Sequence, residues 1–164
     1  MTRPAAARLS GRTKARKQAL DLLYQADLLG QDGRGLLREA RLDADPPLRD
    51  YAAEIVEGVL GRAGSIDQAL EQVLDAGWSL DRLARVDRVL ARIATWEILT
   101  GQVPARVAIA EALVLAGELS TDESPAFLNG VLAAVAKQQP LDVAEVHEAH
   151  QAEVDTDDVG STPA

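Results

Sequence analysis

The stretch LARVDRVLARIATWEIL, residues 83–99, is the part of the sequence that decides the fold. Its apolar side chains recur every three or four residues, the spacing that places them on one face of an α-helix. That face comprises Leu83, Val86, Val89, Leu90, Ile93 and Trp96, together with Glu97. Gly101 ends the pattern, so the sequence predicts a central amphipathic helix here.

Weaker periodic segments on both sides predict further helices. We expect them from Thr13 (as N-cap) to Gly30, near 35–42, from Leu48 to Arg62, from Ser65 to Gly77, from Pro104 onward and from Ser124 to about Lys137. Asn129-Gly130 falls inside the last of these; since no alternating strands flank the pair, we interpret Gly130 as allowing close helix packing. The prediction is an all-α bundle of about seven helices at 12–140, between a flexible basic arm (1–11) and an acidic, disordered tail (141–164).

Composition excludes several classes of protein. The chain has 164 residues without cysteine, so disulfides, thiolate catalysis and Cys-ligated zinc are ruled out. Aromatic residues make up only 3%, too few for an RNA module that stacks bases on a β-sheet. No apolar run could span a bilayer or act as a secretory signal, so we expect a cytoplasmic protein.

Charge is distributed unevenly along the chain. The net charge is −9, but all 17 basic residues lie at or before Lys137, and seven acids follow it. Residues 1–20 contain no acid and six basic residues: Arg3, Arg8, Arg12, Lys14, Arg16 and Lys17. Such a cluster can neutralise RNA phosphates, and a helix extended backwards would align Arg8, Arg12 and Arg16 on one face. A merely solubilising terminus explains the composition equally well.

Two other groups of residues have more than one interpretation. Arg85, Arg88 and Arg92 share a helix face on which Asp81 and Asp87 are interleaved, so an ion-paired exposed surface is favoured over a partner interface. Tyr24 and Phe127 are core residues by type, although both lie near expected helix ends, where an exposed ring could make a contact.

No catalytic constellation is present. His147 and His150 flank a glutamate in the tail, but zinc-hydrolase helices need histidines four apart, and no other histidine exists to form a triad. Neither a Walker loop nor a GxGxxG motif occurs. We expect a protein that is not an enzyme and that has no metal or cofactor.

Three segments together resemble the NusB family. They are RTKARKQALDLLYQADL at 12–28, VDRVLARIATWEIL at 86–99 and VPARVAIAEALVLAGELSTDESPAFLNGVLAAVAK at 103–137. They occur in the family's order and spacing, and the resemblance covers roughly residues 12–137. The third segment, with its Ser-Pro-x-Phe-x-Asn-Gly-Val-Leu run, is the most specific.

The resemblance implies two packed three-helix bundles and a role in transcription antitermination. NusB proteins pair with the small-subunit ribosomal protein NusE, bind boxA RNA and help RNA polymerase read through terminators during ribosomal RNA synthesis. The family's RNA-contacting basic residues correspond here to Arg12, Lys14 and Arg16, with Lys17 as a neighbour. Arg8, from the same basic cluster, is a further candidate RNA contact. The family's other RNA contacts correspond to Glu123 and Phe127, and its contacts to NusE correspond to Tyr24 and Asp87.

Two alternatives remain open at this stage. A NusB-like module or homodimer could act through protein contacts without binding RNA. NusB-like domains also serve as RNA-binding domains of methyltransferases, but such a protein needs a following cofactor domain, whereas this chain ends at Ala164 in an acidic segment. We further hypothesise that this tail lies free or competes with RNA for the basic arm.

Overall fold

The computed structural model describes residues 10–139, so the predicted tail and most of the predicted arm lie outside the described residues. Within them the regular structure is helical, and no strand occurs. The elements are α1 (Gly11–Leu29), α2 (Gly33–Asp43), α3 (Asp50–Gly61), α4 (Ala63–Val73), the 3-10 helix η1 (Leu80–Arg82), α5 (Arg85–Thr100), α6 (Ala105–Leu119) and α7 (Ser124–Lys137). The predicted all-α fold is confirmed.

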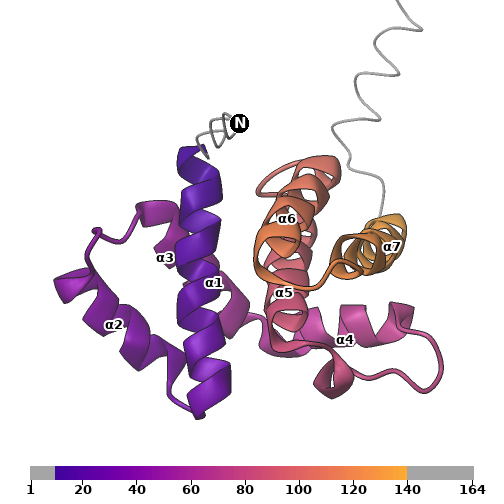
Figure 1. The fold of residues 1–164 in the computed structure, drawn as a ribbon, viewed down its shortest axis with the longest axis horizontal. Helices are drawn as coiled ribbons and strands as arrows, with labels where there is room; N and C mark the ends of the chain where they lie inside the picture. Colours follow the sequence, from indigo (N-terminus) through magenta and orange to yellow (C-terminus); the bar gives the residue numbers. More distant parts are fainter. Residues whose placement is uncertain (1–9, 140–164) are drawn as a thin grey trace, which may run out of the picture.

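The helices form two groups that meet along α1 and α5 (Figure 1). Helices α1, α2 and α3 pack against one another in the first group. In the second group α5, α6 and α7 pack together, and α4 lies against α5 and α7. Because α5 also contacts α1 and α3, it makes most of the contacts between the two groups. None of the described helices is long and apolar enough to cross a membrane.

The start of α1 differs from the expectation. Thr13 is not the N-cap: Ser10 is, and its Oγ accepts a hydrogen bond from the Thr13 backbone N–H at 3.1 Å. The helix therefore begins at Gly11, within the segment predicted to be a flexible arm. Glycine is a weak helix former but is tolerated in the first turn, where a cap supplies the missing acceptor. Arg12 consequently lies on a formed helix.

Several other helix ends follow the local sequence signals, but those of α4 do not: it begins at Ala63, before the expected Ser65, and ends at Val73, before Gly77. Gly30 and Gly101 adopt left-handed φ angles of 61° and 65° and end α1 and α5, a conformation that costs glycine little. Asp32 caps α2 by accepting from two backbone N–H groups. Pro125 occupies the first turn of α7, as expected, although Ser124 is the first helical residue and Glu123 the N-cap position.

The core gathers around α5. Val89, Leu90, Ile93 and Trp96 are all buried, as the spacing predicts, and they meet apolar residues of α1, α3, α4, α6 and α7. Trp96 packs against α3 at Gly58, so closely that a Cβ on Gly58 would stand 2.1 Å from the indole ring. Gly58 is thus the residue that lets α3 approach α5.

The interpretation of Gly130 as a close-packing glycine is wrong. Asn129 and Gly130 do lie inside α7, as predicted, but both are exposed. A Cβ added to Gly130 would meet nothing within 4 Å. Sequence could not separate the two glycines, because their environments depend on which helix face meets a neighbour.

We predict that Gly58→Ala lowers the free energy of unfolding by about 1–3 kcal/mol, because the added methyl group must displace the Trp96 indole. The matched control is Gly130→Ala, which removes a helix-interior glycine without a clash and should be neutral or stabilising by up to about 1 kcal/mol. Urea denaturation followed by circular dichroism measures both. Equal effects of the two substitutions would contradict the close approach of α3 and α5.

Candidate nucleic-acid interface

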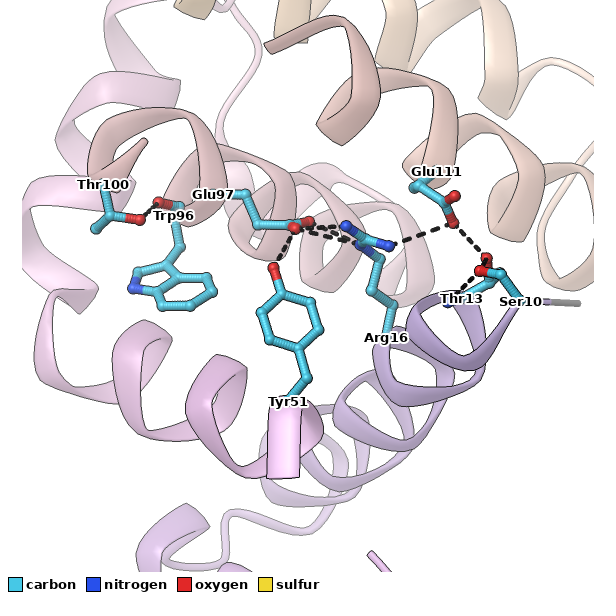
Figure 2. A network of polar contacts seen from close by, with 8 residues as sticks. All are labelled: Ser10, Thr13, Arg16, Tyr51, Trp96, Glu97, Thr100 and Glu111. Atoms are coloured by element: carbon cyan, nitrogen blue, oxygen red, sulfur yellow. Dashed lines mark hydrogen bonds and ion pairs between the residues drawn. The ribbon is translucent and has the colours of Figure 1, made fainter. Parts of the chain in front are cut away.

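A buried ion pair joins α1 to α5 beneath the basic end of the molecule (Figure 2). The Arg16 guanidinium donates through Nε to Glu97 Oε1 at 3.0 Å and through Nη2 to Oε2 at 2.7 Å. Arg16 is only 2% exposed, and Glu97 is fully buried. Two parallel hydrogen bonds of this kind fix both the distance and the orientation of the two groups. The pair therefore sets how α1 lies on α5.

Tyr51 of α3 extends this pair to a third helix. Its hydroxyl donates to Glu97 Oε2 at 2.5 Å, and its ring lies under two guanidinium groups, 4.3 Å from Arg12 and 5.5 Å from Arg16. Burial, followed by the hydrogen bond to Glu97, raises the pKa of Tyr51, so the phenol remains a donor. Arg12 is exposed to solvent yet held against a ring, which restricts its orientation.

A fourth helix, α6, closes the network through Glu111. Thr13 Oγ1 donates to Glu111 Oε2 at 2.7 Å, and Arg16 Nη1 lies 3.5 Å from the same oxygen. Since the Thr13 hydroxyl proton is used in this way, Ser10 Oγ must be the donor in its 2.7 Å contact with Thr13. The first turn of α1 is thus anchored to the second group of helices (Figure 2).

The predicted basic RNA contacts fall into different environments. Arg12, Lys14 and Lys17 are exposed around the first turns of α1. Arg16 is not on their surface: it is committed to Glu97 and Glu111, so the expectation that it shares an open face with Arg12 needs correction. Arg8 lies outside the described residues.

A groove of about 870 Å³ runs beside this basic end, between α1 and the segment that joins α2 to α3. Three basic and three acidic side chains line it, namely Lys14, Lys17, Arg49, Asp21, Asp45 and Asp50. Gln18 of α1 holds the segment between α2 and α3, which forms the opposite wall of the groove. Its amide donates to the Pro47 carbonyl at 3.0 Å and accepts from the Arg49 backbone N–H at 3.0 Å. The cations therefore border a preformed concave surface.

The other two predicted RNA residues lie at a second, smaller groove. Glu123 is exposed and Phe127 is half-buried, and both line a groove of about 300 Å³ beside Trp78 and Arg82. Trp78 was not among the predicted site residues. Its position directly after Gly77, outside every predicted helix, was the available signal.

The two predicted partner-protein residues differ in accessibility. Tyr24 is half-buried on α1. Asp87 is only 7% exposed. Its carboxylate accepts hydrogen bonds from Ser120 Oγ at 2.7 Å and Ser124 Oγ at 2.8 Å. These bonds tie the loop between α6 and α7 to α5. Asp87 therefore holds the loop that carries Glu123 in place.

The arginines of α5 are ion-paired, as expected, but with other acids. The expected exposed surface is wrong, since Arg88 is buried and Arg85 and Arg92 are half-buried. Arg85 and Arg88 donate to Asp27 of α1, and Arg92 donates to Asp67 of α4 at 2.8 and 3.0 Å. Asp81 and Asp87, the acids interleaved in sequence, are not their partners. Burial alone would raise the pKa of Asp27, but hydrogen bonds from Arg88 and Arg85 and their charges outweigh it and lower the pKa.

The described residues hold no group of three His, Asp or Glu side chains that could bind a metal ion. What they do offer is an exposed basic surface at one end of α1, fixed from below by the Arg16–Glu97 pair, and an aromatic groove near the start of α5. A fixed basic surface can bind phosphates at little conformational cost, and exposed aromatic rings can stack on unpaired bases.

Comparison with known proteins gives a consistent result. A family model described as the NusB family matches residues 13–137. The transcription antitermination protein NusB of Kineococcus radiotolerans is 47% identical over 130 residues, which are 79% of this chain and 95% of that protein. The NusB of a Nocardioides species is 42% identical over 133 residues, 80% of this chain and 98% of that protein.

Solved structures agree with the sequence relatives. NusB of T. maritima superposes with a TM-score of 0.73 at 27% identity, over 84% of this chain and 98% of that one. A NusB chain in a crystal structure of the antitermination factors NusB and NusE with double-stranded RNA superposes with a TM-score of 0.69 at 26% identity. That match covers 78% of this chain and 97% of the other.

We predict that Arg16→Met lowers the free energy of unfolding by about 3–5 kcal/mol, because it leaves the Glu97 carboxylate buried without its counter-charge. The double substitution Arg16→Met with Glu97→Leu removes both charges and should regain most of that loss. Chemical denaturation of the single and double variants measures this coupling. Additive losses would show that the two side chains do not interact.

We also predict a pH-dependent effect of Asp27→Asn. Because the folded-state pKa of Asp27 is lowered below its unfolded value of about 3.9, its stabilisation is present above that pH and is lost as the pH falls through the folded pKa. Asp27→Asn should therefore destabilise the protein at pH 7, and the difference from the wild type should shrink towards pH 3. Urea denaturation across this range, with the exposed Glu54→Gln as control, tests it; a constant difference would contradict the ion pairing.

Proposed function

This chain belongs to the NusB family, and from that premise we propose that it is a transcription antitermination factor that binds boxA-type single-stranded RNA together with NusE. The complex of the three promotes processive transcription of ribosomal RNA operons by RNA polymerase. The protein works by binding, without catalysis, and in the cytoplasm, where bacterial transcription occurs.

The RNA-binding part of this proposal rests on one observation, the fixed basic end of α1. Arg12, Lys14 and Lys17 are exposed there, and Arg12 is held over the Tyr51 ring. Cations that are already oriented lose little conformational freedom when they bind a phosphate chain. Displacement of counterions from the RNA then favours binding, so affinity falls as salt rises.

The structure refines which residues we assign to RNA. Arg12, Lys14 and Lys17 contact phosphates in this proposal, and the groove beside Lys14 and Lys17 gives the chain a path along α1. Arg16 acts as a positioning residue, because its donors are directed to Glu97 and Glu111. Phe127 and Glu123 contact a base at the second groove.

NusE binding is assigned to the other end of α1 and the start of α5. Tyr24, half-buried on α1, is the direct contact in this proposal, whereas Asp87 acts through the α6–α7 loop that it holds. Two moderate interactions that share one ligand complex can together give high affinity, since the second becomes intramolecular. An adaptor of this kind needs two separate surfaces on one rigid scaffold.

We predict that the triple variant Arg12→Ala, Lys14→Ala and Lys17→Ala weakens binding of a fluorescent boxA-like RNA in the presence of NusE. Each phosphate contact contributes roughly −0.7 to the log–log dependence of affinity on salt for single strands, so losing three should flatten the slope by about 2. Fluorescence anisotropy titrations between low and physiological salt measure the slope.

The control for this titration is Arg34→Ala with Arg38→Ala, which removes charge from the exposed side of α2. An equal loss of slope in that control would show a diffuse charge effect rather than a site. If NusE binds but RNA does not, alone or with NusE, the chain is a protein-interaction module or homodimer, and the RNA assignment fails.

A further inference from the structure

An exposed tryptophan distinguishes the second groove from the rest of the surface. Trp78 is 54% exposed, whereas Trp96, the other tryptophan of the chain, is 4% exposed. The Trp78 ring lies 6.2 Å from the ring of Phe127, with 43° between their planes. Leaving so large an apolar ring in water forfeits the free energy that burial would provide. The two rings therefore form an aromatic surface that a ligand could cover.

The loop that carries Trp78 is held in one conformation. Gly77 adopts a φ of 89°, and the Trp78 backbone N–H donates to the Asp75 carbonyl at 3.0 Å. Arg82 reaches back from η1 and donates to the Gly77 carbonyl. On the opposite wall, Ser124 and Asp87 fix the start of α7, from which Phe127 projects. Both walls of the groove are thus preformed.

We propose that Trp78 and Phe127 form a stacking site for one unpaired base of the single-stranded RNA, and that Trp78 contributes the larger ring. The inference rests on the proposed function, because it assumes that RNA is the ligand, and it adds Trp78 and Arg82 to the residues that bind it. A groove of about 300 Å³ lies at the lower end of the range for small-ligand sites, which suits a single base.

The polar groups around the groove match those of a nucleotide. Arg82 lies exposed beside the rings, and the guanidinium donors that it does not use for Gly77 can bind a phosphate. The exposed Glu123 carboxylate can only accept hydrogen bonds, so it favours a base with an exocyclic amino group. Adenine, cytosine and guanine carry such a group, whereas the one base-edge donor of uracil, N3–H, lies between two carbonyl oxygens that a carboxylate would repel. The site should therefore disfavour uracil.

The groove lies far from the basic end of α1. Helices α1 and α5 run antiparallel, since Arg16 pairs with Glu97 at one end and Asp27 with Arg85 at the other. The Trp78 groove includes Asp87 and so lies near the Asp27 end. From Arg12 to Asp27, α1 rises about 22 Å at 1.5 Å per residue. Several unstacked nucleotides can cover that distance, so the two sites can bind one strand at two points.

Tryptophan fluorescence tests the proposal directly, because Trp96 is buried and only Trp78 is open to a soluble quencher. We would measure acrylamide quenching of the full chain alone, with NusE, with a boxA-like RNA, and with both. The expected result is that RNA protects Trp78 from acrylamide and shifts its emission, with or without NusE present. The variant Trp78→Phe identifies the remaining signal as that of Trp96.

Affinity measurements on matched variants separate stacking from charge. Trp78→Ala should weaken RNA binding about 5- to 50-fold while leaving the salt slope unchanged, because stacking releases no counterions. Trp78→Phe keeps a ring and should restore most of the affinity. Leu42→Ala, which alters an apolar residue 83% exposed on α2, is the control and should bind RNA like the wild type.

RNAs with one abasic position each locate the stacked base. Removal of that base should weaken binding to the wild type but have no further effect on Trp78→Ala. Restoring it as uracil should recover less affinity than restoring it as a base with an amino group, and Glu123→Gln should reduce that difference.

The outcomes distinguish this inference from the proposed function. If RNA binds and the basic triple variant weakens it, but Trp78 stays open to acrylamide and Trp78→Ala binds normally, the stacking site is overturned and the adaptor function stands. If NusE alone protects Trp78 and RNA adds nothing, the groove is a protein surface and the inference is again overturned. If no RNA binds even with NusE, both the proposed function and the inference fail.

Discussion

The contact between a buried arginine and a buried glutamate organises this molecule. Removing the charges of Arg16 and Glu97 from water is costly, and the cost is recovered only if two parallel hydrogen bonds form with good geometry. That requirement admits few relative positions of α1 and α5. Since Tyr51 and Glu111 bind the same pair, α3 and α6 are positioned by it as well. One ion pair thereby sets the relation between the two groups of helices.

The same interaction shapes the surface above it. Arg12 lies one turn before Arg16 on α1 and packs on the ring whose hydroxyl is fixed by Glu97. Arg12 is consequently oriented by a network whose central pair, Arg16 and Glu97, is buried. At the other end of α1, Asp27 binds the arginines that begin α5, and Asp87 holds the loop before α7. Each proposed binding surface thus rests on polar contacts between helices.

The candidate site could be predicted in part. A run of basic residues near the N-terminus marks the basic end of α1, and the resemblance to the NusB family supplied Phe127 and Glu123. Sequence could not tell that Arg16 is buried while Arg12 is exposed, because the two are four residues apart on one helix face. An acid among apolar positions, Glu97, was the available sign that some cation must be buried opposite it. Trp78 could not be predicted as a site residue, because it belongs to no helix pattern.

By itself the sequence determined the helices and several of their ends, because periodicity, glycines, prolines and capping side chains act over a few residues. Only the tertiary structure decided which charges pair and which glycine is crowded. Arg85 and Arg88 bind Asp27 and not the acids beside them in sequence. Trp96 packs against Gly58, whereas a Cβ on Gly130 would meet no neighbour within 4 Å. Such choices depend on helix faces brought together from distant parts of the chain, so local sequence does not contain them.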